Sequence, residues 1–504
     1  MFNKTIARVK GWLTKMGIIK SLEKLTDHKK IVVNEEIYNR IAKNKAIYQG
    51  FLSEWHTVTE KSSVTGDTFE RNMLTFGMGK VLPEEMAKLI FNEKAKIDVS
   101  VKDDEGSSKV ASDFIMDVLK NNGFHKNFQR YLEYGYALGG MAVKVYVYDG
   151  KIKLAYAVAD AFYPLGNDSE NIDEALFINE EFKNGKYYTL LEWNEWEGDL
   201  YRVTNELYQS EVEGELGVNV PLSVLYEDFE PVVYMKKISR PLFTYFKLNT
   251  ANNKDLTSPL GVSIFENSYD TLYMLDFMYD FWFNEFELGR RRIAVDRSMI
   301  KPFTDINGNT RTAFDPKETV FTALNGEDLK NVVDLTVELR TQEIIDSINA
   351  LLDILAMQVG FSTGTFNFDG KSVKTATEIV SENSKTYQTK NSHETLVEEG
   401  IKELITSIVD IGLLYELYTG SSDLEIDIDF DDSIAQDRQE NFNYYSSAAS
   451  QGLMPKEIAI QRIHSVTKET ALEWIEMMDK ESAINVDANA TDLFGIGATN
   501  IGRD

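Results

Sequence analysis

Alternating apolar and polar positions predict a β-hairpin in the first half of the chain, where the pattern turns to strands from Phe124 onward. Valines stand at every second position of residues 143–147, and apolar residues resume this period of two at residues 152–156. The dipeptide Asp149–Gly150 lies between the two runs and favours a tight two-residue turn. The two runs are therefore predicted to pair as antiparallel strands.

A second hairpin is predicted directly afterwards. Apolar and aromatic residues gather at 176–178 and 187–191, on either side of the turn dipeptide Asn184–Gly185. Residues 201–208 can extend the same sheet. The first half of the chain is thus predicted to contain an antiparallel sheet within an α+β fold.

Two segments with helical spacing follow, separated by a short β-rich insert. Residues 262–289 carry apolar side chains at steps of three or four, which predicts one long helix of about 40 Å. Residues 336–359 repeat this spacing. The insert, residues 290–335, contains strand-like runs and a turn dipeptide at Asn307–Gly308. Helix, insert and helix together predict a protruding, hairpin-like stalk.

A loop and a third long helix are predicted next. The loop covers residues 360–371, and Thr375 and Glu378 then stand at capping-box spacing, which marks a helix N-terminus. Between residues 382 and 394 the only large apolar side chain is Tyr387. A helix with so few apolar residues has no wide stripe to bury in its own subunit. We therefore predict that this stretch crosses solvent or a subunit contact.

The C-terminal part predicts one strand and several short helices. Residues 424–430 alternate apolar with acidic side chains, as an edge strand does. Residues 433–482 have helical spacing that is broken near Gly452 and Pro455. Taken together, the fold class is predicted to be α+β.

Composition restricts the classes of protein that fit. The 504 residues include 43% hydrophobic ones, which suffices for a large core, and no cysteine, which excludes disulfides and thiolate metal sites. No run of eighteen apolar residues occurs, so neither a membrane span nor a membrane partner is expected. The formal net charge of -28 argues against a broad, tight grip on phosphate. Any contact with DNA is therefore predicted to be transient.

Two motifs suggest an enzyme, but their surroundings do not fit. Residues 360–364 spell G-x-S-x-G, the nucleophile elbow of hydrolases, yet a helix precedes them where a strand is required. Residues 365–372 resemble a phosphate-binding loop with Lys371 and Ser372 at its end, but Thr365 replaces the first glycine. A nucleotide-dependent enzyme that uses Lys371 and Ser372 remains the alternative hypothesis.

Acidic residues after residue 424 give no metal site. Asp427, Asp429 and Asp431 match the opening of a calcium loop, but Asp432 and Arg438 stand where glycine and a bidentate acid are required. No metal and no other cofactor is predicted.

The order of the segments is similar to that of the portal proteins of siphophages that infect Gram-positive bacteria, the head–tail connector rings. Four strings carry the resemblance: LGGMAVKVY at 138–146, YTLLEWNEW at 188–196, SPLGVSIF at 258–265 and KTATEI at 374–379. Their order, rather than any single string, resembles that family. The resemblance implies a portal fold with a mixed α/β wing, two stem helices that flank a small clip, a tunnel loop, a long spine helix and a helical crown.

Carried over to this chain, the family's parts have the following bounds: N-terminal region and wing 1–261, stem helices 262–289 and 336–359, clip 290–335, tunnel loop 360–373, long helix and wing strand 374–432, crown and C-terminal tail 433–504. The resemblance implies a ring, typically of twelve subunits, at the capsid vertex, through which double-stranded DNA is packaged and ejected. It implies contacts with the terminase large subunit, a head–tail adaptor, and the major capsid and scaffolding proteins. It implies a location in the virion, with assembly in the host cytoplasm, and no enzymatic activity.

Two sets of site residues follow from the resemblance. The residues expected to face DNA in the tunnel loop are Ser362, Thr363, Thr365, Asn367, Asp369 and Lys371. The residues expected to dock partners in the clip are Arg290, Arg291, Arg292, Asn307 and Gly308. The arginines follow a predicted helix, so complementing the dipole at its C-terminus is an equally good explanation for them.

Overall fold

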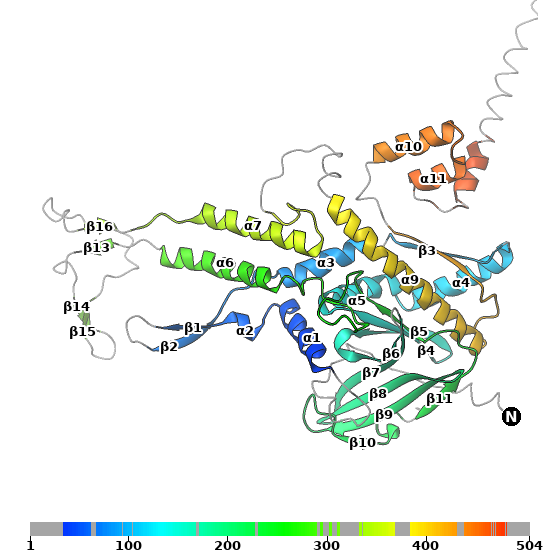
Figure 1. Cartoon of the computed structure of the whole chain (residues 1–504), viewed down its shortest axis with the longest axis horizontal. Helices are drawn as coiled ribbons and strands as arrows, with labels where there is room; N and C mark the ends of the chain where they lie inside the picture. The colour runs from blue at the N-terminus through cyan, green and yellow to red at the C-terminus, as the bar shows by residue number, and fades with distance from the viewer. Residues whose placement is uncertain are drawn as a thin grey trace, which may run out of the picture. The chain divides into compact units, whose positions relative to one another are not determined.

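The computed structural model describes residues 34–61, 67–92, 94–102, 104–167, 171–226, 230–289, 293–295, 302–304, 310–312, 332–334, 336–367, 384–430, 438–464, 466, 468, 470–478 and 480. The chain divides into two compact units. The larger unit contains residues 1–370 and 385–430, and the smaller one contains residues 371–384 and 431–504. Helices and strands are mixed in the larger unit, so the predicted α+β class is confirmed (Figure 1). None of the helices in the described ranges is long and apolar enough to cross a membrane.

Helices cover the sheets of the larger unit. Those of the first part of the chain are α1 (Glu35–Tyr48), α2 (Ser53–His56), α3 (Met78–Ile90), α4 (Glu105–Asn121) and α5 (Phe124–Leu138). The prediction that strands begin at Phe124 is wrong, because α5 occupies residues 124–138. Its residues Phe124, Phe128, Leu132 and Tyr136 recur every four positions and are all buried, as one face of a helix requires.

Two main sheets form the body of this unit. The first has the strand order β12-β4-β5, with β4 (Met141–Tyr148), β5 (Lys151–Val158) and β12 (Phe243–Phe246). The second has the order β10-β9-β8-β7-β6, and β11 also pairs with β9. Its strands are β6 (Phe162–Asn167), β7 (Ile172–Lys183), β8 (Lys186–Glu197), β9 (Leu200–Ser210), β10 (Val218–Val220) and β11 (Val232–Met235). All pairs are antiparallel.

Both predicted hairpins are confirmed. Asp149 and Gly150 join β4 to β5 with φ of 48° and 67°, and Asn184 and Gly185 join β7 to β8 with φ of 52° and 78°. Two successive residues with positive φ form the turn whose twist matches that of paired strands, which explains the Asp-Gly and Asn-Gly dipeptides.

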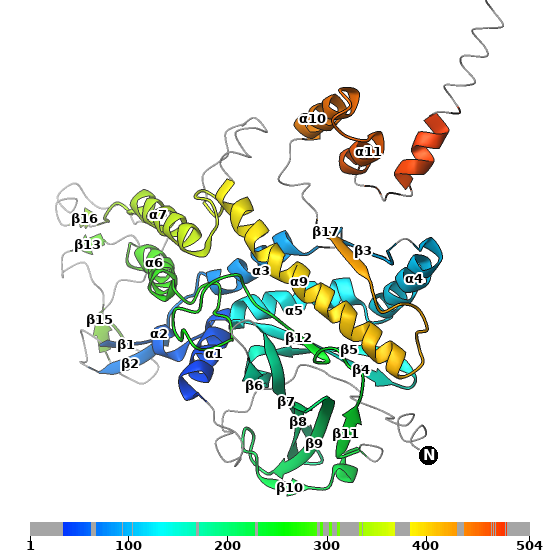
Figure 2. The same ribbon diagram turned by 45° about the vertical axis from the view of Figure 1, so that its right-hand side comes forward.

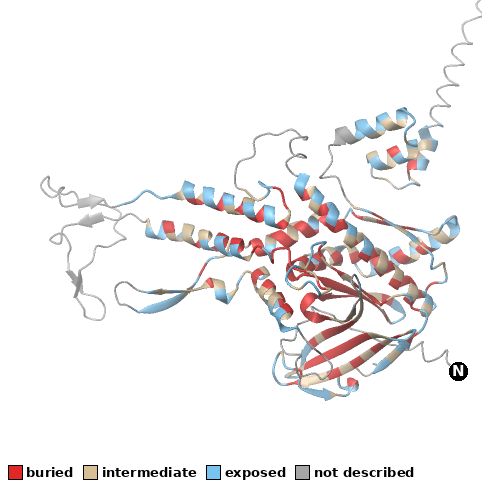
Figure 3. Ribbon diagram, in the orientation of Figure 1, coloured by how far each residue is buried: buried red, intermediate tan, exposed pale blue. Residues whose placement is uncertain are grey.

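Helix α9 (Ser384–Leu414) crosses this body in both views (Figures 1 and 2). Gly400 lets it approach β12 closely, because a Cβ there would lie 2.5 Å from the ring of Phe246. Further along, the Ser407 hydroxyl donates to the Pro241 carbonyl at 3.0 Å. Buried residues therefore run continuously from the sheets into α5 and α9 (Figure 3).

The polar first half of α9 buries one face in its own subunit and exposes the other, which includes Lys385, Gln388, Asn391 and Ser392. That this stretch crosses solvent or a subunit contact stays a prediction. Lys390 pairs with Glu394 at 2.6 Å, and their side chains are 3% and 12% exposed. Thr386 and His393 are buried as well, and both have hydrogen-bond partners in this unit. Polar partners, rather than an apolar stripe, thus accommodate this stretch. The predicted capping box at Thr375 and Glu378 lies outside the described residues.

The predicted stalk helices are α6 (Tyr269–Leu288) and α7 (Thr341–Val359). Both exist, but each begins later than the sequence predicts, at 269 rather than 262 and at 341 rather than 336. Between them the described parts of the insert are four short strands, which form two antiparallel pairs. They are β13 (Ile293–Val295) with β16 (Val332–Asp334), and β14 (Pro302–Thr304) with β15 (Thr310–Thr312).

Two further strand pairs complete the larger unit. They are the hairpin β1 (Thr57–Lys61) with β2 (Thr68–Asn72), and β3 (Lys96–Ser100) with β17 (Glu425–Asp429). The strand predicted at residues 424–430 is therefore confirmed, with β3 as its partner.

The smaller unit contains α10 (Arg438–Ser450) and α11 (Lys456–His464). Gly452, with φ of 70°, and Pro455 lie between the two helices, as predicted from their sequence.

Candidate functional site

Helices α6 and α7 pack side by side and bury one face of each. Leu272 and Leu275 of α6 are almost fully buried, as are Ile348, Leu352 and Leu355 of α7. Helix α6 has an unusual surface, since large apolar side chains remain exposed from Tyr273 to Leu288. They are Tyr273, Met274, Phe277, Phe283, Phe286 and Leu288. Exposed apolar surface of this kind marks a site of contact with another molecule.

Glu285 and Arg340 join the two helices at the root of the insert. The Arg340 backbone N–H and Nε donate to Glu285 Oε1 at 3.1 and 3.2 Å, and Nη2 donates to Oε2 at 2.8 Å. The guanidinium also lies over the ring of Phe281. These hydrogen bonds hold the pKa of Glu285 below its usual range. The chain thus enters and leaves the insert through one ion-paired junction.

Two aspartates one helical turn apart attach α6 to the N-terminal segment of the chain. Asp276 accepts from the Phe76 backbone N–H at 2.6 Å and contacts His56 Nε2 at 3.1 Å. Asp280 receives both terminal nitrogens of Arg71 at 2.9 and 2.8 Å. The N-terminal segment therefore fixes α6 through contacts that sequence reasoning missed. Part of the signal was present, because Asp276 and Asp280 each stand between large apolar residues at i and i+4, one helical turn apart.

Gly360 ends α7 and starts the loop that follows it. Its φ of 88° is left-handed, and a Cβ would lie 2.6 Å from the Thr389 side chain. Phe361 is then fully buried, and Phe366 packs against it with ring centroids 5.2 Å apart. The start of the loop is thus folded onto α7 and α9.

Polar contacts hold the same loop from two sides. Thr386 N–H donates to Ser362 Oγ at 3.2 Å, and Ser362 N–H donates to Thr386 Oγ1 at 2.8 Å. Asp353 of α7 accepts from the Gly364 N–H at 2.7 Å and from Asn367 Nδ2 at 3.2 Å. Residues 363–365 remain exposed between these contacts.

The structure therefore divides the predicted tunnel-loop residues. Ser362 is 4% exposed and its hydroxyl is bound to Thr386, so it lies in the interior of the subunit rather than on a surface. Asn367 is half-buried against Asp353, while Thr363 and Thr365 are exposed. Asp369 and Lys371 lie outside the described residues. So do the predicted docking residues Arg290, Arg291, Arg292, Asn307 and Gly308.

The two enzyme-like motifs stand in the wrong local structure. The G-x-S-x-G run begins at the C-terminal cap of α7, not after a strand, and its serine is buried. The phosphate-loop-like run also follows this helix, and its Lys371 and Ser372 lie outside the described residues. Among the residues that the structure describes, no cluster of His, Asp or Glu side chains could hold a metal ion.

Comparison with known proteins gives a family. No curated protein sequence matches the chain. A solved structure described as the neck of an empty GTA particle computed with C6 symmetry is 10% identical in sequence, covers 75% of this chain and 89% of its own, and superposes with a TM-score of 0.37. A score of this size carries no argument about fold or function. The model of the family described as "Phage portal protein, SPP1 Gp6-like" matches residues 27–485. Because this match spans most of the 504 residues, the chain belongs to the SPP1 Gp6-like family of phage portal proteins.

Proposed function

We propose that this portal protein works as one of twelve identical subunits, and that neighbouring subunits meet along α6 and α7. As a phage portal protein it belongs to the ring at the capsid vertex through which the genome is packaged. The observation that carries the proposal is the exposed apolar surface of α6, where Phe283 and Phe286 are 52% and 48% exposed. Contact with a second copy removes such surface from water.

The family's parts map onto this chain in the proposal as follows: wing 1–261, stem α6 and α7, clip 290–335, tunnel loop 360–373, long helix and wing strand 374–432, crown and tail 433–504. The clip would dock the terminase large subunit during packaging and a head–tail adaptor afterwards. The major capsid and scaffolding proteins would surround the ring during assembly in the host cytoplasm. The role is structural, and ATP hydrolysis belongs to the terminase.

The tunnel loop would meet DNA through few charges. Thr363 offers a neutral hydroxyl from the exposed part of the loop, whereas the exposed Thr365 donates its hydroxyl proton to the Ser362 carbonyl at 2.6 Å. Lys371 adds one cation and Asp369 one anion. Each added lysine–phosphate contact strengthens salt-dependent attraction, so a nearly neutral loop lets a duplex slide. The formal net charge of -28 agrees with such a low-friction channel.

Ring assembly is tested with Phe283→Asp. A buried aspartate at a subunit contact is costly, so sedimentation velocity should show subunits in place of rings. Phe182→Asp is the matched control, because Phe182 is 58% exposed on β7, away from α6. Intact rings in the Phe283 variant, or a subunit number other than twelve in class averages of the wild type, contradict the proposal.

Docking and DNA contact need separate measurements. Replacing residues 306–309 with a short turn should leave rings intact and weaken terminase binding in a pull-down. Lys371→Ala should alter the amount of nuclease-protected DNA per filled head, and Asp369→Lys should lower it further by adding attraction. Wild-type values in both assays contradict these assignments.

A further inference from the structure

Strand β12 borders a cleft whose lining residues lie outside α6, α7 and the insert. β12 is the edge strand of its sheet, and the cleft along it has a volume of about 390 Å³. Its opposite wall comes from the start of β7, residues 171–173, from Trp196 at the end of β8, and from Glu403 of α9. Three separate parts of the larger unit thus enclose one open strand edge.

The hydrogen-bond pattern of β12 shows which backbone groups face the cleft. The Val145 N–H donates to the Leu242 carbonyl at 2.8 Å, and the register pairs Phe243 with Lys144. Hydrogen-bonded and non-hydrogen-bonded pairs alternate in an antiparallel ladder. Residues 242, 244 and 246 therefore bond toward β4, and Phe243 and Tyr245 direct their N–H and C=O groups away from it. Both residues line the cleft.

Two polar side-chain atoms in the cleft wall are buried without a hydrogen-bond partner in the described part of the chain. They are Thr244 Oγ1 and Arg240 Nε. Thr244 is 1% exposed, so water satisfies it poorly. Arg240 reaches Glu403 with Nη2 at 2.7 Å. Because Thr244 Oγ1 and Arg240 Nε are buried, a ligand in the cleft would contact the backbone edge of β12 rather than these two atoms.

Lys247 supplies a cation at the far end of the cleft. Its Nζ donates to the Pro259 carbonyl at 2.9 Å, and no carboxylate among the described residues pairs with it. Burial lowers the pKa of this ammonium group. A half-buried ammonium with one neutral acceptor is therefore suited to receive a carboxylate.

The backbone groups along the cleft decide what kind of ligand fits. Arg240 and Lys247 stand on either side of the four residues of β12. The edge also presents both donors and acceptors, whereas a phosphate or a metal ion satisfies only one kind. A peptide backbone satisfies both in alternation, as in the addition of a strand to an open sheet edge.

We propose that this cleft binds an extended peptide segment of a partner protein, which adds to β12 as a further strand and places a carboxylate opposite Lys247. The backbone of the segment pairs with Phe243 and Tyr245, and an apolar side chain lies against Trp196. This site is separate from α6, α7 and the insert, so a partner could remain bound through packaging.

The test uses assembled rings and the fluorescein-labelled peptide Asp-Val-Thr-Val-Thr-Val-Asp, which reads the same in both strand directions. We expect anisotropy to show saturable binding, and Lys247→Met to weaken it at least about tenfold, because a charge-assisted hydrogen bond is lost. Lys236→Met is the matched control; it removes the same charge from an exposed position outside the cleft and should bind normally. Hydrogen exchange at the Phe243 and Tyr245 amides should slow when the peptide binds.

Two peptide variants keep the test independent of protein folding. Asparagine in place of both aspartates should weaken binding as Lys247→Met does, and N-methylation of alternate residues should abolish it in only one of the two possible registers. No binding to wild-type rings, or equal binding by Lys247→Met and wild type, overturns the proposal. It is also overturned if ring assembly alone protects the two amides, because a second copy would then cover the cleft. In each of these cases the rings themselves, and hence the portal function, remain.

Discussion

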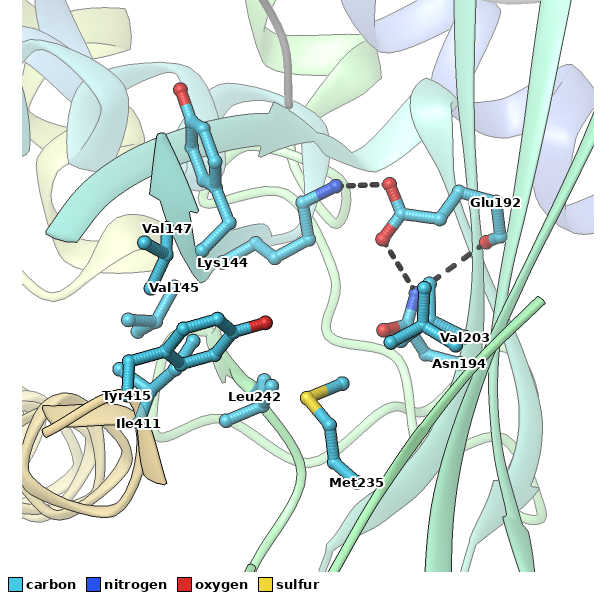
Figure 4. Close-up of a pocket in the computed structure, with 12 residues that line it drawn as sticks. Lys144, Val145, Val147, Glu192, Asn194, Val203, Met235, Leu242, Ile411 and Tyr415 are labelled. Carbon is cyan, nitrogen blue, oxygen red and sulfur yellow. Dashed lines mark hydrogen bonds and ion pairs between the residues drawn. The ribbon is translucent and has the colours of Figure 1, made fainter. Parts of the chain in front are cut away.

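Lys144 of β4 and Glu192 of β8 form an ion pair in the interior between the two main sheets (Figure 4), with side chains that are 5% and 3% exposed. Asn194 Nδ2 donates to the second oxygen of Glu192 at 2.9 Å, and Tyr201 donates to Asn194 Oδ1 at 3.0 Å. Burial opposes both charges, since it lowers the pKa of Lys144 and raises the pKa of Glu192. A cavity of about 40 Å³ lies beside the pair.

Lys144→Met should destabilise the subunit by roughly 3–5 kcal/mol, because it leaves Glu192 buried without its cation. The double variant Lys144→Met with Glu192→Leu should recover most of this loss, since two apolar side chains then fill the same space. Urea unfolding followed by circular dichroism measures both. If the free energy of unfolding of Lys144→Met lies within about 1 kcal/mol of that of the wild type, the ion pair is not needed for stability.

His393 should make the subunit sensitive to acid. Its Nδ1 accepts from the Asn249 N–H at 3.1 Å, and burial lowers the pKa of His393 from 6.5 to about 4. Between these values the unfolded chain binds a proton that the folded chain does not, so stability falls as the pH drops from 6.5 toward 4. The loss is on the order of 3 kcal/mol.

Replacement of this histidine isolates its contribution. His393→Asn keeps an acceptor for Asn249 and cannot take up the proton, so its stability relative to wild type should rise as the pH falls through this window. His464→Asn, at an exposed position of α11, is the control and should follow the wild-type profile. Parallel pH profiles for His393→Asn and wild type would contradict the prediction.

Gly360→Ala should lower the free energy of unfolding by roughly 2–4 kcal/mol. The left-handed backbone disfavours a Cβ, and the Thr389 side chain occupies the space that the Cβ needs. Gly364→Ala separates the two effects. Gly364 has φ of 79°, but a Cβ there meets nothing within 4 Å, so only the backbone penalty of about 1 kcal/mol is expected. Thermal unfolding of both variants is the measurement, and equal losses would rule out the steric effect of Thr389.

Ser362→Ala should destabilise the subunit by about 1–2 kcal/mol, because the buried Thr386 N–H loses its acceptor. Thr363→Ala, one residue further along the exposed part of the loop, should change stability by less than about 0.5 kcal/mol. Denaturant unfolding distinguishes the two. A neutral Ser362→Ala would show that this hydrogen bond does not contribute to stability.

Arg340→Ala should loosen the junction at the root of the insert with only a small change in the melting temperature, because the Arg340 side chain is 63% exposed. Limited proteolysis should then cut between residues 289 and 340 faster than in the wild type. Arg202→Ala removes another surface arginine, paired with Glu195 and Glu197, and should leave this rate unchanged. Equal cleavage rates for all three proteins would exclude a role for the junction.

The sequence by itself determined the elements whose signals are local. The Asp149–Gly150 and Asn184–Gly185 turns need only two residues with positive φ, and the strand periods beside them need only the next few positions. The existence of α6 and α7, and the interruption at Gly452, are equally local. The order of such segments also sufficed to indicate the portal family, which the family match then established.

Only the tertiary structure decided where α6 begins, and the reason lies far away in the sequence. Residues 262–268 have helical spacing, but Glu266 accepts from the Ser263 N–H and from Asn44 Nδ2 of α1, and also pairs with Arg40. These contacts hold a turn that delays the helix to Tyr269. The start of α7 is set in the same way, because the Arg340 N–H bonds to Glu285 of the other helix.

Buried polar groups escaped sequence reasoning for the same physical reason. A polar residue is stable in the interior only when a partner satisfies it, and the partner can lie anywhere in the chain. Thr386 depends on Ser362 and Lys144 on Glu192, and in both cases the fold alone brings the two together. Local periodicity therefore predicted several of the helices and strands, while helix α5, the positions of the ion pairs, the cleft at β12 and the buried face of α9 followed only from packing.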